Sequence, residues 1–235
     1  LALAVATSCH DAPDALAYWS SEKKTLEQKF TMANDGLLAI DCVPANPSAT
    51  QLMTLFETAC DDRCQDPGRI SRHAILTCSE EPISVLIRRL KKTRPQALEA
   101  RWIDLPIGDD ACGAFADLHG HPSAQSLAKA IMSGIAAHHG HLLRIFVKKL
   151  LSQLPDFWAG LEQRINQEQA DLIEALADRL VCVDAIMSEQ MHRLALIIVA
   201  GELAIGFGLL PWPENTVRDA VRRLANRRLA IERDE

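Results

Sequence analysis

Short apolar runs alternate with helical stretches in the first half of the chain. Apolar runs of about four to eight residues, bounded by turn residues, are typical of buried parallel strands. Such runs predict strands at Leu16–Trp19, Leu37–Cys42, His73–Cys78 and Arg101–Leu105. Helical spacing of apolar residues predicts helices between them, at Lys23–Asn34, Ser48–Cys60 and Glu80–Leu90. Strands that alternate with helices predict an α/β domain with a parallel sheet.

The second half shows no strand pattern, and its apolar residues recur at helical spacing. The predicted helices are Ser123–His138, His141–Gln153, Phe157–Leu180, Ile186–Phe207 and Thr216–Ile231. Residues that interrupt helices separate them, namely Gly140, Pro155, Gly208 and Pro211–Pro213. The chain is therefore predicted to form an α/β core over residues 1–110 and an all-α bundle over residues 111–235.

One apolar stretch, Leu194–Leu210, is long enough to raise the question of a membrane span. It is short for a span and contains Glu202 and three glycines, so a buried core helix is the better interpretation. The net charge of −6 argues against non-specific binding of nucleic acid by the whole surface, although a ring of subunits can still present a local basic channel. Seven cysteines without a pairing framework indicate reduced thiols and a cytoplasmic protein.

The run Leu37-Leu38-Ala39-Ile40-Asp41 resembles a Walker B strand. In such a strand the final aspartate holds the Mg²⁺ of a nucleotide through water. The alternative is any buried strand followed by a polar turn. An active ATPase usually has a glutamate next, as the base that polarises the attacking water; here Cys42 follows, and a thiol is a poor substitute.

Two further segments have both a functional and a structural interpretation. Ala74–Ser79 resembles a sensor strand, with Thr77 near its polar tip, but a strand that ends in a turn has the same pattern. Lys91-Lys92-Thr93-Arg94, followed by Arg101, could supply arginine fingers, because the guanidinium group binds phosphate oxygens in a bidentate way. Lys91 and Lys92 are also the best candidates for DNA phosphate contacts, and a solvated basic turn is the alternative.

Several histidines lie close together along the chain: His119, His121, His138, His139 and His141. Zinc accepts imidazole ligands, but no cysteine or carboxylate of familiar spacing accompanies them. Histidines that satisfy backbone groups at turns and helix ends are the favoured interpretation. The phosphate-binding motif Gly-x-x-x-x-Gly-Lys-Ser/Thr does not occur in the 235 residues.

In their order along the chain, these motifs resemble the domain-of-unknown-function family nine-two-seven. The resemblance also includes Leu1–Ala6, which looks like the helix after the family's phosphate-binding loop, and Ile103–Pro106. Near the C-terminus it rests on Arg193–Leu196, Ala200-Gly201-Glu202-Leu203-Ala204 and Trp212-Pro213-Glu214. Members of this family are AAA+-like, superfamily-three-related ATPase domains in primase-helicase proteins of phages and plasmids.

The resemblance implies an incomplete parallel P-loop sheet followed by a helical bundle, with the phosphate-loop strand between the sensor strand and Arg101–Leu105. It implies that ATP and Mg²⁺ bind the intact protein, which forms a homo-oligomeric ring on DNA, whereas no nucleotide is expected to bind this chain alone. Asp41 would position the metal, Thr77 would sense phosphate, and Arg94 or Arg101 would act on a neighbouring subunit. Arg193 would be a second sensor. The missing loop suggests that the natural chain starts earlier.

Two other functions are compatible with the sequence. The chain could be a non-catalytic assembly or DNA-binding module that keeps the ATPase fold, since Cys42 replaces the glutamate. It could also be a helical regulatory protein of the toxin-antitoxin type with a small α/β domain.

Overall fold

The computed structural model describes residues 16–18, 23–32, 36–43, 73–89, 101–106, 115, 117–178 and 183–234. Contacts divide the chain into two compact units, which we describe separately. The sheet unit contains Leu1–Lys92 and Ile107–Leu143, and the helical unit contains Thr93–Pro106 and Arg144–Glu235. These boundaries differ from the division near residue 110, which stays a prediction about domains.

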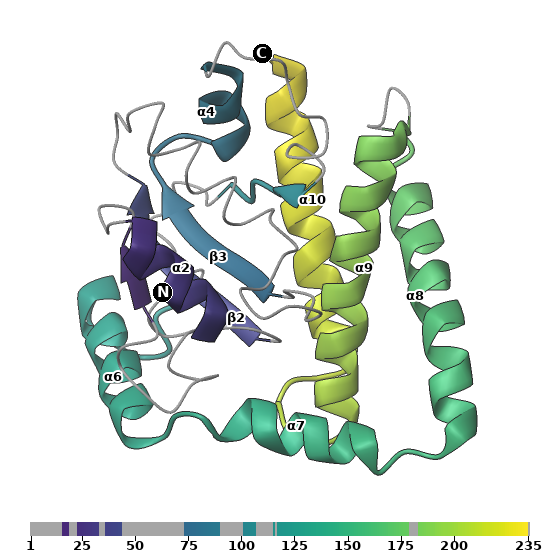
Figure 1. Ribbon diagram of the computed structural model, residues 1–235, viewed down its shortest axis with the longest axis horizontal. Helices are drawn as coiled ribbons and strands as arrows, with labels where there is room; N and C mark the ends of the chain where they lie inside the picture. Colours follow the sequence, from purple (N-terminus) through teal and green to yellow (C-terminus); the bar gives the residue numbers. More distant parts are fainter. Residues whose placement is uncertain are drawn as a thin grey trace. The chain divides into compact units, whose positions relative to one another are not determined.

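In its described residues, the sheet unit contains three parallel strands in the order β1-β2-β3 (Figure 1). They are β1 (Leu16–Tyr18), β2 (Gly36–Val43) and β3 (His73–Ser79), and α2 (Lys23–Met32) connects the first two. A parallel pair needs such a crossover connection, because the chain must return to the starting edge of the sheet. The structure thus confirms the first three predicted strands, the first predicted helix and the parallel sheet.

The middle of β2 is the best-buried part of the sheet. Leu38, Ala39 and Ile40 are all buried, and Ala17 of β1 and Leu26 of α2 are buried as well. A strand covered on both faces loses the polar alternation of a surface strand, which explains the continuous apolar run in the sequence.

The predicted helix after β3 is also present. α4 (Ile83–Arg89) begins just after Pro82, whose carbonyl oxygen accepts hydrogen bonds from the backbone N–H groups of Val85 and Leu86. Proline is tolerated at such a helix start, because its position needs no N–H donor.

α6 (Ala124–Ala137) completes the described helices that lie wholly within the sheet unit. The hydroxyl of Ser123 caps it by accepting a hydrogen bond from the backbone N–H of Ser126, which satisfies one of the free donors at a helix start. Gly140 follows with a φ of 75°, a left-handed conformation that favours glycine. This glycine separates α6 from the next helix, as the sequence predicts.

The helical unit consists mainly of α8 (Pro155–Ala175), α9 (Ala185–Gly206) and α10 (Thr216–Asp234). Figure 1 shows these three helices side by side, and α9 contacts both of the others. α7 (His141–Leu151) enters this unit at Arg144. Buried apolar residues of α8, α9 and α10 and the residue after α8 form the core: Leu172, Leu176, Met191, Leu194, Ile198, Val221, Ala225 and Leu229.

The apolar stretch at Leu194–Leu210 forms most of α9, the central helix of this core. Leu194, Ala195 and Ile198 are fully or almost fully buried there. The prediction of a buried core helix is therefore confirmed. Among the described residues, no helix is long and apolar enough to cross a membrane.

The predicted strand at Arg101–Leu105 is wrong. These residues form no strand, and they belong to the helical unit. Ile103 packs against the helical core, and the side-chain amide of the buried Gln190 donates a hydrogen bond to the carbonyl oxygen of Trp102 at 3.1 Å. A helix side chain thus satisfies a backbone group that we expected to pair with a neighbouring strand. The predicted helix at Ser48–Cys60 and the helix that the resemblance implies at Leu1–Ala6 lie outside the described residues.

Candidate functional site

The carboxyl ends of β2 and β3 bring two of the predicted site residues onto neighbouring strands. Ile40 lies opposite Thr77, so Asp41 is the next residue along β2 beyond this pair. Tyr18, the last residue of β1, lies opposite Asp41. We call Tyr18, Asp41 and Thr77 the strand-end site. Ligands of parallel α/β sheets bind beyond the carboxyl ends of the strands, which is where these three residues lie.

The pairing of β2 with β3 is irregular at this site. Ile40 pairs with Thr77 and Val43 with Ser79, so two residues of β2 span the distance that one residue of β3 spans. The extra residue falls at Asp41-Cys42. Such a bulge redirects side chains and interrupts the regular ladder of hydrogen bonds, and bulges are common next to active sites.

The hydroxyl of Thr77 is engaged within the sheet. Its Oγ1 donates a hydrogen bond to the carbonyl oxygen of Ile40, with 2.9 Å between the two oxygens. A hydroxyl group has only one proton to donate. While this bond holds, Thr77 can accept a hydrogen bond from another group but cannot donate one to a phosphate oxygen. Phosphate sensing by Thr77 therefore requires this bond to open or a bridging water.

Sequence reasoning overlooked Tyr18 as a candidate. Its side chain is 53% exposed although its neighbour Ala17 is buried. The signal was available, because the ends of parallel strands meet at one edge of a sheet and Tyr18 lies next to the last residue of the predicted strand Leu16–Trp19. A phenol at this edge offers both a hydrogen-bond donor and a ring on which a nucleobase can stack.

The other predicted site residues are not gathered at the strand ends by any described contact. Lys91, Lys92 and Arg94 lie outside the described residues. Arg101 and Arg193 belong to the helical unit. Arg193 forms an ion pair with Glu189 one turn earlier on α9, at 3.0 Å.

The histidines that raised the question of zinc have individual local contacts. Nδ1 of His139 lies 3.1 Å from the carbonyl oxygen of Ile135, and the backbone N–H of His119 donates to Asp117 at 2.7 Å. Over the part of the chain that the structure describes, no three His, Cys, Asp or Glu residues are grouped to hold a metal ion.

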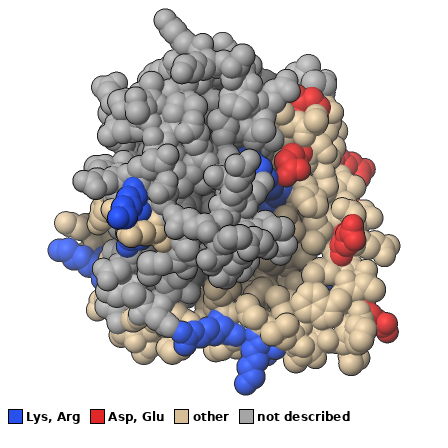
Figure 2. Space-filling model, in the orientation of Figure 1, with Lys and Arg blue, Asp and Glu red and all other residues tan. Residues whose placement is uncertain are grey.

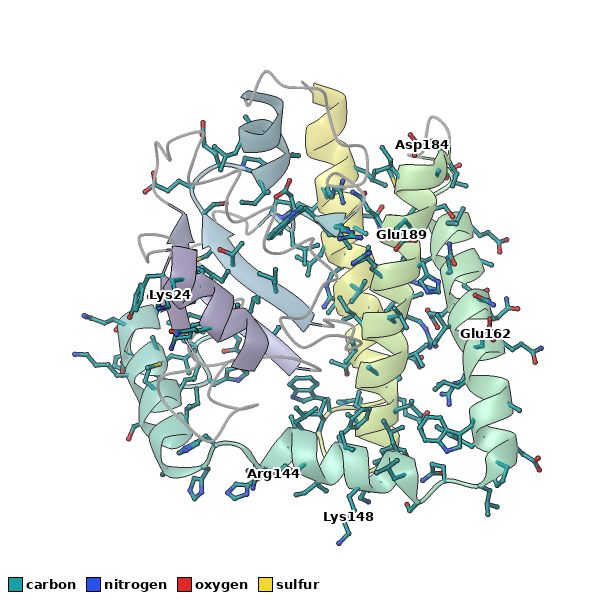
Figure 3. The ribbon with its side chains drawn as sticks, viewed as in Figure 1. Lys24, Arg144, Lys148, Glu162, Asp184 and Glu189 are labelled. Carbon is teal, nitrogen blue, oxygen red and sulfur yellow. The ribbon has the colours of Figure 1, made fainter. Side chains whose placement is uncertain are left out.

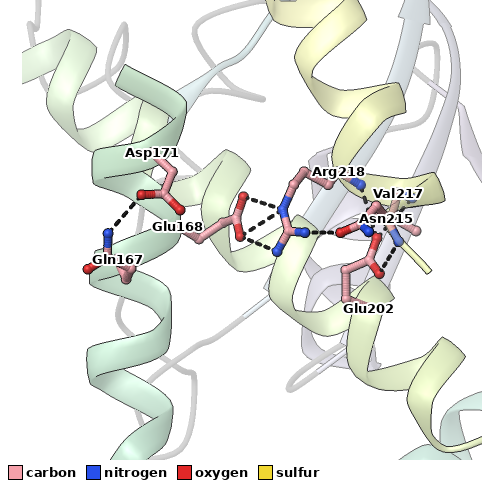
Figure 4. Close-up of polar contacts among 7 residues, drawn as sticks. All are labelled: Gln167, Glu168, Asp171, Glu202, Asn215, Val217 and Arg218. Atoms are coloured by element: carbon pink, nitrogen blue, oxygen red, sulfur yellow. Dashed lines mark hydrogen bonds and ion pairs between the residues drawn. The ribbon is translucent and has the colours of Figure 1, made fainter. Parts of the chain in front are cut away.

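A second polar cluster joins the three long helices of the helical unit (Figure 4). The carboxylate of Glu168 on α8 accepts two hydrogen bonds from Nε of Arg218 at 2.9 and 3.1 Å, and one from Nη2 at 2.7 Å. Nη1 of the same guanidinium group donates to the side-chain oxygen of Asn215. The hydrogen bond to Glu168 raises the pKa of Arg218 above its usual value, so the group stays charged over the whole ordinary pH range.

Glu202 of α9 holds the start of α10. Its carboxylate accepts hydrogen bonds from the backbone N–H groups of Asn215, Val217 and Arg218, at 2.8, 3.1 and 3.1 Å. These are free donors at a helix start, where the helix dipole also favours negative charge. Glu202 thus replaces the usual capping side chain, since Asn215, the residue before α10, accepts a hydrogen bond from the Arg218 side chain instead.

Gly201, the residue before Glu202, allows α9 and α10 to pack closely. A Cβ atom at this position would lie 2.7 Å from both methyl groups of Val217 on α10. Only glycine therefore lets α9 and α10 approach this closely at the point where Glu202 caps α10. The Gly201-Glu202 pair, which contributed to the family resemblance, has a structural role in joining these two helices.

The Glu168–Arg218 pair was not anticipated from the sequence. Glu168 occupies an apolar position of the α8 stripe that includes Ile165, Leu172 and Leu176, at helical spacing. An acid in that stripe was a signal for a buried partner, but its partner lies 50 residues away in the sequence.

Comparisons of this chain with protein-family models, with curated proteins and with solved structures found no match.

Proposed function

We propose that this chain carries part of the core of a P-loop, AAA+-like ATPase of the primase-helicase type, which acts on DNA in the replication of mobile genetic elements. In this proposal β2 is the Walker B strand and β3 is the sensor strand. The observation that carries it is the placement of Asp41 and Thr77 on neighbouring parallel strands, at their carboxyl ends, beside a bulge.

The strand order supports this assignment. β2 lies between β1 and β3, and β3 is an edge strand of the described sheet. A phosphate-loop strand added next to β3 would place its loop at the same edge as Asp41, because all strands are parallel. The described side chains of β3 are exposed or half-buried, in contrast to the buried centre of β2, which suits a strand that receives a further neighbour.

The residues at this edge fit magnesium bound together with a nucleotide. Mg²⁺ usually takes one or two carboxylates, with phosphate oxygens and water filling its other positions. Asp41 would supply the carboxylate, and the ion would neutralise charge on the transferred phosphoryl group. The lysine that holds the phosphates in P-loop proteins comes from the motif that these 235 residues lack.

Hydrolysis is expected to be weak, because Cys42 stands where a catalytic glutamate is usual and Thr77 donates its proton within the sheet. These two features also favour a second candidate function, a non-catalytic module for assembly or DNA binding that keeps the ATPase fold. DNA contact is assigned to Lys91 and Lys92 in both cases. Arg94, Arg101 and Arg193 keep their proposed roles towards the nucleotide.

Sequencing the coding region upstream of Leu1 tests the proposal directly. It should encode a glycine-rich loop that ends in Gly-Lys-Thr or Gly-Lys-Ser. In a protein that includes this loop, Asp41→Asn should lower Mg²⁺-dependent ATP hydrolysis about 100-fold, since the metal loses its carboxylate. Asp117→Asn, at an exposed turn of the sheet unit, is the matched control and should leave the rate unchanged.

The two candidate functions differ at position 42. Cys42→Glu should raise the hydrolysis rate if the site is weakened, because it restores the carboxylate base. No change in a protein that binds nucleotide would favour the non-catalytic module. Hydrolysis that Asp41→Asn leaves intact would contradict the metal role of Asp41.

A further inference from the structure

The corner between α7 and α8 carries exposed basic and apolar side chains, beside a single exposed acid, Asp156, in the first turn of α8. α7 contains no acidic residue, and Arg144 and Lys148 are exposed on it. Leu151 and Leu154 at the corner are 73% and 75% exposed, more than any other large apolar side chain of the described chain. Exposed apolar side chains that cluster beside charged residues mark interaction surfaces.

This corner contacts the residue that follows α9. Nζ of Lys149 donates a hydrogen bond to the carbonyl oxygen of Phe207, at 2.8 Å, just beyond the end of α9. The rings of Phe146 and Phe207 also lie in contact, with their centroids 5.9 Å apart. Arg144 and Lys148 project away from this contact, as Figure 3 shows. We call Arg144, Lys148, Leu151 and Leu154 the basic end of the helical unit.

The opposite end of the α8–α9 pair has the complementary charge. α8 is 21 residues long, which separates its two ends by about 30 Å. Glu174, Asp178 and Asp184 are exposed near the connection from α8 to α9, together with Val183, which is 45% exposed. Figure 2 shows acidic side chains along the right side of this face, from its upper to its lower part, and basic ones at its lower edge and on its left. We call Glu174, Asp178, Val183 and Asp184 the acidic end of the helical unit.

We propose that the basic end of one copy of this chain binds the acidic end of a second copy. The two ends differ from each other, so the contact is heterologous and repeats from copy to copy, as a ring or an open chain of subunits requires. Arg144 and Lys148 would face Glu174 and Asp178, and Leu151 and Leu154 would pack near Val183. The inference deepens the proposed function by giving a contact for the homo-oligomeric ring that the family resemblance implies, but the contact itself needs no nucleotide.

Two other partners fit the basic end less well. A DNA backbone offers phosphates but no apolar surface to cover Leu151 and Leu154. An anionic membrane would cover both, but the net charge of −6 opposes the approach of the chain to such a surface. A second copy supplies opposite charge and an apolar side chain together.

Sedimentation velocity of the 235-residue chain without nucleotide tests the contact. The wild-type chain should form larger species as its concentration rises, and fewer of them at about 0.5 M salt than at about 0.05 M salt. Arg144→Glu with Lys148→Glu should weaken this association roughly tenfold or more, because repulsion replaces attraction. Glu174→Lys with Asp178→Lys should weaken it by a similar factor.

A mixture of the two charge-reversed variants provides the decisive measurement. Each variant alone should remain monomeric, whereas the equimolar mixture should associate again, since every contact in it can pair opposite charges. Arg164→Glu with Arg223→Glu is the matched control, because it changes the net charge by the same amount at exposed sites away from both ends. Leu151→Ser with Leu154→Ser removes the apolar part alone and should also weaken association.

Three results would overturn the inference. They are a monomeric wild-type chain, a mixture that stays monomeric although both variants have wild-type melting temperatures, and a control that weakens association as much as the end variants. Binding of the wild-type chain to vesicles of anionic lipid, lost in Arg144→Glu with Lys148→Glu and without self-association, would assign the basic end to a membrane instead. Each result leaves the nucleotide site of the proposed function untouched.

Discussion

The sheet unit and the helical unit use their polar residues in opposite ways. In the sheet unit, Asp41 follows the buried apolar part of β2, opposite Tyr18 of β1 and beside an irregular pairing with β3. In the helical unit, Glu168 and Glu202 lie between helices, and their oxygens are taken up by an arginine and by a helix start. The polar residues of the helical unit therefore join helices, whereas those at the strand ends of the sheet unit are the ones that we propose for chemistry.

Loss of the Glu168–Arg218 ion pair should have the largest effect on the free energy of unfolding. Glu168→Ala should lower the free energy of unfolding by about 2–3 kcal/mol, because it leaves the Arg218 charge without its partner between helices. The Glu168 side chain is only 6% exposed, and that of Arg218 is 30% exposed. Urea denaturation followed by circular dichroism would measure the loss.

Glu189→Ala is the matched control, since Glu189 pairs with Arg193 on the surface of one helix. Exposed pairs contribute roughly 0–1 kcal/mol, so the control should cost much less. Equal losses for the two variants would mean that the Glu168–Arg218 pair is no more important than a surface pair, and the contrast between the units would be weakened.

The second largest effect on the free energy of unfolding is expected where α9 and α10 approach closely. Gly201→Ala should lower the free energy of unfolding by about 1–3 kcal/mol, because the new methyl group meets both methyl groups of Val217. Gly160→Ala, at an exposed helix position with open space around it, should instead be neutral or stabilising. A double variant, Gly201→Ala with Val217→Ala, should recover part of the loss; no recovery would mean that contact with Val217 is not the cause.

The smallest effect is expected in the sheet unit. Thr77→Val removes the hydroxyl that donates to Ile40 and should cost about 1 kcal/mol. Thr77→Ser keeps the hydroxyl and should retain most of the stability. The comparison becomes sharper if Thr77→Val changes nucleotide hydrolysis in the loop-containing protein far more than it changes the melting temperature. A change in melting temperature alone would make Thr77 a structural residue, like those of the helical unit.

In the described residues, periodicity predicted the helices and strands correctly except at Arg101–Leu105, and this error is informative. The strands β1, β2 and β3 and the helices from α6 onward follow from apolar runs and helical spacing, which depend on burial of one face or both. Residues Arg101–Leu105 have the same short apolar pattern but pack against helices. A short apolar segment specifies that it is buried, and the neighbour that buries it decides whether it becomes a strand.

The candidate site could be predicted only in part from the sequence. The apolar run before Asp41 located a strand end, and parallel pairing places Thr77 beside it. Tyr18 could have been added by the same argument. The hydrogen bond from Thr77 to Ile40 could not, because it depends on the local bulge and on the rotamer of one side chain.

By itself the sequence determined most of the described helices and strands, their order and the buried strand that contains Asp41, because local spacing of apolar residues reflects which faces are buried. Only the tertiary structure decided which polar residues are used to hold the fold together. Glu168 meets Arg218, and Glu202 meets the start of α10, across separations of 50 and 13 to 16 residues. Such pairings depend on how helices pack against each other, so no local sequence pattern predicts which residues meet.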